Sequence, residues 1–175
     1  MGSARETNRV NEPRREQARE LLYLEDFKGG QRFKCGRSYS VTEGEIKSFA
    51  AQFDPQPMHL DPAAARASVF GGLVASGWHT SAITMRLLVE SGPAFAGGTV
   101  GLGAEISWPQ AVRPGDTLYV EGEVLEVIPS SSRPDRGRVR LLAETRNQHG
   151  EVVLRVVTHI LVPGRTAGTT ASPPS

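Results

Sequence analysis

Residues 73–89 read LVASGWHTSAITMRLLV, and this stretch decides the fold. Apolar residues fall on nearly every face of a helix drawn through it, and Ser91, Gly92 and Pro93 follow as a stop signal. A helix that is apolar on all sides is normally buried inside a protein. We therefore expect residues 73–89 to form a central helix that other elements cover.

The sequence after this helix is rich in residues that favour β-strands, and turn signals divide it. These signals are RPGD at 113–116, PSSSRPDRG at 129–137 and NQHG at 147–150, the last of which fits a compact hairpin loop. We expect strands at residues 33–41, 99–112, 117–128, 138–146 and 152–162. A run of helices followed by a run of strands indicates an α+β fold. An antiparallel sheet wrapped around the apolar helix would complete one core.

Two shorter helices are expected before the central one. Thr42 fits the N-cap of the first, with Glu45 as its capping-box partner, and Pro55 ends that helix. Asp61 and Pro62 fit the cap and first position of the second. A loop restrained by prolines is expected between these two helices.

Length, composition and charge narrow the classes of function. The 175 residues fit a single domain. The 20 Lys and Arg balance the 19 Asp and Glu, and no block of like charge indicates a nucleic-acid or membrane surface. Cys35, the one cysteine, has no partner for an internal disulfide. The chain shows neither a secretory signal nor an apolar run near the roughly 20 residues of a membrane span, so we expect a cytoplasmic protein.

The domain is expected to span residues 21–162. Residues 1–20 are charged and hold few large apolar side chains, whereas residues 163–175 are rich in Pro, Gly, Ser and Thr. We expect a charged N-terminal extension and a flexible C-terminal tail, both outside the core.

Asp54 and His59 form the first candidate for chemistry. They lie five residues apart in FDPQPMHLD, on a segment that Pro55 and Pro57 restrain. A carboxylate and an imidazole held close together can share a water, one taking its proton while the other supplies a proton elsewhere. The same spacing also fits a structural role, in which Asp54 caps a turn and His59 bonds to backbone. The residues alone leave both interpretations open.

The second candidate is GLVASG at 72–77, where a glycine-rich entry meets the central helix. Backbone N–H groups near a helix N-terminus can bind developing negative charge. Alternatively, the glycines serve a turn, and Gly77 only allows close packing against the sheet. Other chemistry is disfavoured, because no second His accompanies His59 at the spacing of zinc enzymes and Ser76 lacks the glycine of a nucleophile elbow.

The stretches VTEGEIKSFAAQF, DPQPMHLDPAAARAS, FGGLVASGWHTSA and VRPGDTL together resemble the MaoC-like dehydratases, which include the (R)-specific enoyl-CoA hydratases. The hydratase signature of Asp, any residue, Asn, Pro, an aliphatic residue and His falls on residues 54–59. Gln56 stands in place of the Asn, Phe53 where many hydratases have Gly, and Met85 where some have Ser. The resemblance implies a hotdog fold, a curved antiparallel sheet around a central helix. It also implies a homodimer or a dimer of dimers.

The same resemblance implies roles for particular residues. Asp54 and His59 would bind and activate water, and the Gly77 backbone N–H would contact the thioester oxygen. Ser76, Gly72 and Trp78 become candidate substrate contacts. The implied reaction is reversible hydration of a trans-2-enoyl-CoA to an (R)-3-hydroxyacyl-CoA.

The implied partner is an acyl-CoA or acyl-carrier-protein thioester, with no metal and no cofactor beyond the coenzyme A of the substrate. Two alternatives stay open. One is a hotdog acyl-CoA thioesterase, since one fold serves several reactions. The other is a non-catalytic protein that binds acyl thioesters.

Overall fold

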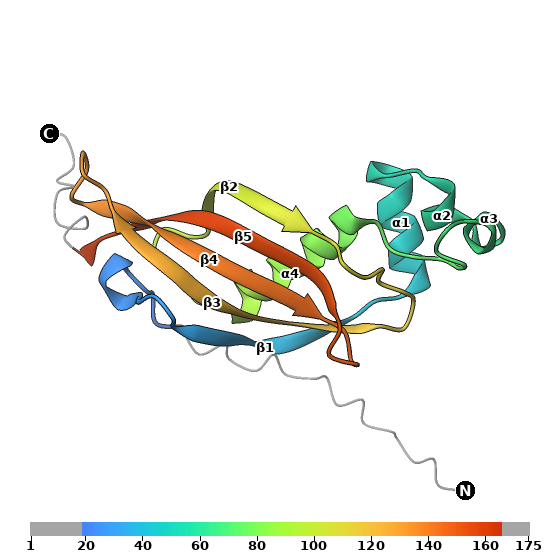
Figure 1. The fold of residues 1–175 in the computed structure, drawn as a ribbon, viewed down its shortest axis with the longest axis horizontal. Coiled ribbons are helices and arrows are strands. Elements are labelled where there is room, and N and C mark those ends of the chain that lie inside the picture. Colours follow the sequence, from blue (N-terminus) through green and yellow to red (C-terminus); the bar gives the residue numbers. More distant parts are fainter. Residues whose placement is uncertain (1–18, 166–175) are drawn as a thin grey trace, which may run out of the picture.

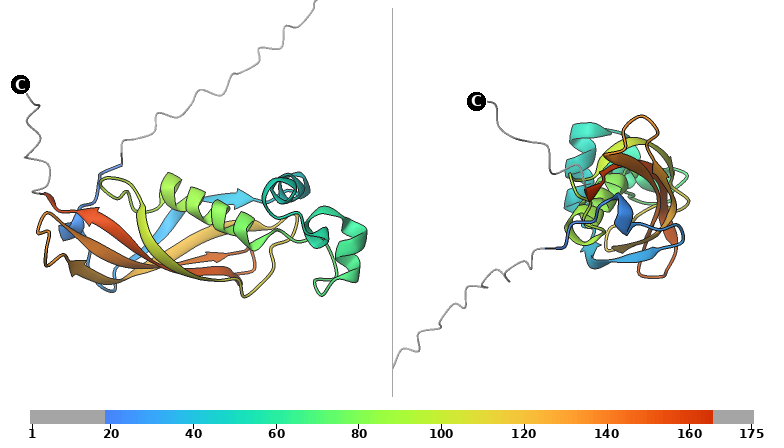
Figure 2. Two further views of the ribbon diagram at one scale, coloured as in Figure 1. Left: turned by 90° about the horizontal axis from the view of Figure 1, so that it is seen from above. Right: turned by 90° about the vertical axis from the view of Figure 1, so that its left-hand side faces the viewer.

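The computed structural model describes residues 19–165, which form one antiparallel five-stranded sheet around a helix (Figure 1). The strands are β1 (Arg32–Ser40), β2 (Val100–Ser107), β3 (Thr117–Pro129), β4 (Arg136–Arg146) and β5 (Val152–Pro163). Their order in the sheet is β1-β3-β4-β5-β2, with every neighbouring pair antiparallel. Helix α4 (Gly77–Ser91) lies along the concave side of the curved sheet (Figure 2). The expected α+β fold is confirmed.

The strands bury alternate residues, as a sheet with one covered face requires. In β4, Val139, Leu141, Ala143 and Thr145 are buried, whereas the residues between them are partly exposed. The expected hairpin at 147–150 joins β4 to β5. Its turn closes with a hydrogen bond from the Gly150 N–H to the Asn147 carbonyl and places Gly150 at a φ of 79°.

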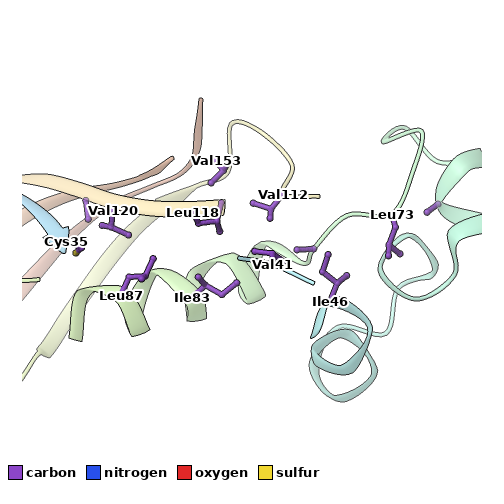
Figure 3. Close-up of a cluster of buried hydrophobic side chains, with 13 residues drawn as sticks. Cys35, Val41, Ile46, Leu73, Ile83, Leu87, Val112, Leu118, Val120 and Val153 are labelled. Carbon is purple, nitrogen blue, oxygen red and sulfur yellow. The ribbon is translucent and has the colours of Figure 1, made fainter. Parts of the chain in front are cut away.

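The main core fills the space between α4 and the sheet. Ile83 and Leu87 on α4 point toward Leu118 and Val120 on β3 (Figure 3). Full burial of such side chains stabilises a fold by about 1.5–3 kcal/mol each. This packing fixes α4 against the sheet. No helix within residues 19–165 is long and apolar enough to cross a membrane.

The start of α4 differs from the sequence-based expectation. The helix begins at Gly77, not at Leu73, and ends at Ser91. The preceding residues are extended and hydrogen-bonded to other segments: the Ala75 N–H donates to the Val112 carbonyl at 2.8 Å. An apolar run fits a buried extended segment as well as a buried helix, so the sequence pattern did not separate the two.

Two short helices follow the sequence-based expectation. Helix α1 (Glu43–Phe53) begins with the predicted capping box of Thr42 and Glu45, and both of its reciprocal hydrogen bonds are present. Helix α3 (Pro62–Ala67) begins with the predicted Asp61 cap. These helices gather beyond one end of the sheet (Figure 1).

Between these helices lies α2 (Pro57–Leu60), where the sequence predicted only a loop. Pro57 occupies the first turn, where its fixed φ suits a helix and its missing N–H costs no hydrogen bond. Near the N-terminal end of the domain, a 3-10 turn, η1 (Leu24–Asp26), precedes β1.

The expected end of β2 needs a correction. Strand β2 ends at Ser107 and not at residue 112, because the chain then leaves the sheet so that Val112 can pair with Ala75. Contacts also continue past residue 162, since the Gly164 N–H donates to the Asp135 carbonyl. The rest of the predicted extension and tail, residues 1–18 and 166–175, lies outside the described residues.

Candidate functional site

Asp54 lies at the C-cap of α1, and its carboxylate accepts two side-chain hydrogen bonds. The Ser76 hydroxyl donates to Oδ2 at 2.6 Å, and the Gln56 amide donates to Oδ1 at 2.7 Å. The Ser76 bond is the main cause that lowers the pKa of Asp54, followed by the Gln56 bond, and both outweigh partial burial. The charge interaction with His59 also lowers the pKa of Asp54, by a smaller amount. Asp54 is therefore held as a carboxylate.

His59 lies on α2 and is 6% exposed. Its Nδ1 atom is 2.9 Å from the Val74 carbonyl oxygen, which can only accept a hydrogen bond. Nδ1 therefore carries a proton, and whenever the ring is neutral Nε2 keeps a free lone pair. Nε2 lies 3.4 Å from Oδ2 of Asp54. In the neutral form of the ring two hydrogen-bond acceptors thus face each other, and one water can donate a hydrogen bond to each.

These groups open onto a pocket of about 340 Å³. Its lining includes Asp54, Gln56, Met58, His59, Phe70, Gly77, Trp78, Thr80, Trp108 and Val112. Gly77 is the first residue of α4, where backbone N–H groups have no partner within the helix. This end of the helix therefore presents a donor and the positive end of the helix dipole beside the two acceptors.

Gly77 and Trp108 are in close contact at the pocket wall. A Cβ atom added to Gly77 would lie 2.9 Å from Cε2 of Trp108, which is too close without movement of the indole. The indole Nε1–H donates to the Ser81 hydroxyl at 3.3 Å, and the Trp78 and Trp108 rings meet edge to face. Glycine at this position therefore lets the indole cover the start of α4.

The structure brings together four of the six predicted site residues. Asp54, His59, Gly77 and Trp78 line one pocket. Ser76 lies behind Asp54, is 1% exposed and uses its hydroxyl for internal hydrogen bonds. The substrate roles predicted for Ser76 and Trp78 stay predictions.

Gly72 lies apart from the lining of this pocket. A Cβ at Gly72 would lie 3.3 Å from a guanidinium nitrogen of Arg113, and that guanidinium donates to the Phe70 carbonyl at 2.8 Å. The predicted role of Gly72 in substrate binding also stays a prediction. Its observed surroundings indicate a place in the loop that Arg113 holds.

A second, apolar cavity of about 150 Å³ lies between α4 and the sheet. Its walls come from α4, β2, β4 and β5 and include Ser81, Thr84, Met85, Leu88, Ile106, Leu141, Val156 and Ile160. Ser81 accepts the hydrogen bond from Trp108, which lines the first pocket. The pocket at Asp54 and His59 and the apolar cavity are therefore neighbours on either side of this contact.

Two functional features escaped sequence-based reasoning. The contact of Trp108 with Gly77 is one, because nothing in the local sequence of Trp108 connects it to that glycine. The donor role of Ser76 toward Asp54 depends on a contact between segments far apart in the chain. In contrast, Gln56 was visible as a departure from the family signature, and its amide donates to Asp54.

No group of three or more His, Cys, Asp and Glu side chains gathers as a metal site within residues 19–165. Asp61, two residues after His59, uses its carboxylate to cap α3.

Comparisons with known proteins agree on one family. Residues 26–147 match the model of the MaoC like domain. YdeM of Bacillus subtilis (strain 168) is 38% identical over 130 residues, covering 73% of this chain and 89% of YdeM.

Two solved structures extend the likeness to the fold. The MaoC-like dehydratase from Rhodospirillum rubrum is 55% identical, with a TM-score of 0.80 over 82% of this chain and 98% of that chain. R-Hydratase PhaJ1 from Pseudomonas aeruginosa is 28% identical, with a TM-score of 0.67 over 89% of this chain and 96% of that chain. The curved sheet around α4 is the hotdog fold of these proteins. The chain belongs to the family defined by the MaoC like domain.

Proposed function

We propose that this protein catalyses the reversible hydration of a trans-2-enoyl-CoA to an (R)-3-hydroxyacyl-CoA. The observation that carries the proposal is the pair of acceptors, Asp54 and Nε2 of His59, 3.4 Å apart beside the N-terminus of α4. Membership in a family with solved members called dehydratase or hydratase supports a hydro-lyase in general. The enoyl thioester substrate and the roles of the two residues are our inference.

In the proposed mechanism, a single water donates two hydrogen bonds, one to Asp54 and the other to Nε2 of His59. Its oxygen then attacks C3 of the enoyl group while His59 takes a proton as general base. The neighbouring Asp54 carboxylate stabilises the imidazolium that forms. This division of roles rests on the lowered pKa of Asp54 and on the lone pair that Nε2 of His59 holds when its ring is neutral.

Attack at C3 moves the electrons of the C2–C3 double bond toward the thioester carbonyl, whose oxygen becomes enolate-like. The Gly77 N–H would donate to this oxygen, where the α4 dipole favours negative charge. The His59 imidazolium then returns its proton to C2. The product carries one added water, and both residues regain their starting states.

The apolar cavity beside the pocket offers space for the acyl chain. It lies past the Trp108–Ser81 contact, and α4 contributes Met85 and Leu88 to its wall. Apolar walls suit an alkyl chain, because its transfer from water contributes about 0.8 kcal/mol per buried methylene. We propose that the thioester lies at Gly77 and that the chain runs into this cavity.

The two departures flanking Asp54 fit a working site. Gln56, in the place of the usual Asn, donates to Asp54 and so keeps a polar contact to its carboxylate. Phe53 packs its ring against Phe49 on the same helix, with 5.0 Å between ring centroids. The Gln56 contact, which orients the carboxylate, favours catalysis over passive binding of a thioester.

The first test replaces the two acceptors. Asp54→Asn and His59→Gln should each lower kcat for hydration of crotonyl-CoA by about 100-fold or more, because each removes a group that binds or deprotonates the water. Loss of the enoyl thioester absorbance measures the rate. Asp61→Asn and His149→Gln are matched controls, since Asn caps a helix as well as Asp and His149 is exposed in a hairpin. Rates equal to wild type in both site variants would contradict the assignment.

The second test concerns the contact between Gly77 and Trp108. Gly77→Ala should lower kcat by about 10- to 100-fold, because its methyl group must displace the indole and with it the pocket wall beside the oxyanion contact. Gly44→Ala, near the start of α1, is the control, since a Cβ there meets nothing within 4 Å. An unchanged kcat in a folded Gly77→Ala protein would show that catalysis does not depend on the close contact between Gly77 and Trp108.

We also propose that two copies join through β2. Among the described strands, β2 pairs with β5 alone and forms an edge of the sheet, with Val100 and Leu102 about half exposed. An exposed apolar edge strand is a template for pairing with another chain. A second copy paired antiparallel on β2 would extend the sheet and cover these side chains.

The mass in solution tests this dimer. Wild-type protein should sediment at twice its chain mass of 18.9 kDa, and Leu102→Lys should shift it toward the monomer by placing a charge in the interface. Val69→Lys is the control, since Val69 is 95% exposed on a loop before α4. A wild-type monomer at micromolar concentration would contradict the proposal.

A further inference from the structure

We propose that Ser76 is a positioning residue, whose hydroxyl holds the Asp54 carboxylate in the orientation that binds the reacting water. This inference rests on the proposed function, because it assigns Ser76 a part in that reaction. It replaces the expectation that Ser76 contacts the substrate. Ser76 and Gly77 would then be adjacent residues with separate tasks, one for the carboxylate and one for the thioester oxygen.

The direction of the Ser76 proton follows from its two hydrogen bonds. Its oxygen accepts from the Trp78 N–H at 3.2 Å as the N-cap of α4. Its proton is donated to Oδ2 of Asp54 at 2.6 Å. Because Ser76 is 1% exposed, water cannot readily replace Asp54 as its acceptor. The helix cap therefore aims the hydroxyl at the carboxylate.

The position of Ser76 is fixed in turn by hydrogen bonds along the buried face of α4. Its carbonyl accepts from the backbone N–H and the hydroxyl of Thr80, at 3.1 and 3.3 Å. The Thr84 hydroxyl donates to the Thr80 carbonyl and lies 2.6 Å from the Thr145 hydroxyl on β4. Since Thr84 has used its proton, Thr145 donates to it. This series of contacts ties the first turns of α4 to the sheet.

The two donors to Asp54 differ in rigidity. Gln56 donates to Oδ1 from an exposed position. The Ser76 hydroxyl is buried, and it both donates and accepts a hydrogen bond within the protein. Each carboxylate oxygen thus has one protein donor and a lone pair left for water. His59 is the titratable group that faces Asp54, and its Nε2 atom approaches the same Oδ2. Loss of the Ser76 donor would let the carboxylate rotate away from His59.

Ser76 could instead act only as the cap of α4, and two substitutions separate these roles. Ser76→Gly and Ser76→Ala both remove the donor to Asp54. Glycine is tolerated at N-caps at a small cost in stability, whereas alanine loses most of the cap. A role confined to the cap predicts that only the alanine variant suffers. A positioning role predicts that both variants lose activity to a similar extent.

The experiment measures hydration kinetics against pH and the titration of the Asp54 carboxyl carbon by ¹³C NMR. In both variants we expect kcat to fall by about 10- to 100-fold with little change in KM, as for loss of a hydrogen bond to a charged group. Ser76 lowers the pKa of Asp54, so its removal should raise that pKa. The acidic limb of the activity profile should therefore move to higher pH. Ser48→Ala, exposed on α1, should change none of these values.

The outcomes separate this inference from the proposed function. An Asp54 titration that is identical in Ser76→Gly and wild type overturns the positioning role, whatever the activity. Normal kcat in a folded Ser76→Gly protein overturns it as well. If the titration moves as expected but wild-type protein hydrates no enoyl-CoA, the contact to Asp54 is supported and the proposed reaction fails.

Discussion

The extended segment Val74–Ser76 is buried, and its backbone groups must find hydrogen-bond partners away from water. The Val74 carbonyl accepts from Nδ1 of His59, and the Ala75 N–H donates to the Val112 carbonyl. The next two residues supply the Ser76 hydroxyl, which donates to Asp54, and the backbone N–H at the first position of α4. The hydrogen bonds that allow this segment to be buried are therefore also those that assemble the site.

The rest of the fold holds this segment in place. Packing of Ile83 and Leu87 against β3 fixes α4, and the contact between Thr84 and Thr145 fixes its rotation relative to β4. Asp54 at the end of α1 and His59 on α2 both contact this segment. Asp54 and His59 thus belong to short helices, whereas the donor proposed for the thioester oxygen belongs to the central helix.

Local sequence signals predicted the parts of the fold that local chemistry determines. The capping box at Thr42, the Asp61 cap and the turn at 147–150 all appeared where their residues indicated. The start of α4 and the end of β2 were placed wrongly, because both depend on pairing between Ala75 and Val112, residues that are distant in the chain. An apolar pattern records burial but does not identify the partner strand.

In the candidate site, too, local sequence predicted some features and missed those that depend on contacts between distant segments. The spacing of Asp54 and His59 left a catalytic and a structural interpretation open, and the geometry is compatible with both. His59 is bonded to backbone through Nδ1, and this same bond leaves Nε2 free to face Asp54. The contacts of Ser76 with Asp54 and of Trp108 with Gly77 lay beyond sequence reasoning, since they arise only when distant segments meet.

Hydration in ¹⁸O-labelled water tests the central claim most directly. Crotonyl-CoA is incubated with the protein in H₂¹⁸O, and the thioesters and free coenzyme A are followed by mass spectrometry. The account predicts 3-hydroxybutyryl-CoA of R configuration that has gained one labelled water at C3, with coenzyme A still attached. Free coenzyme A with labelled crotonate would instead show thioester hydrolysis, and unchanged crotonyl-CoA would show that Asp54 and His59 do not activate water toward this substrate; either result would contradict the account.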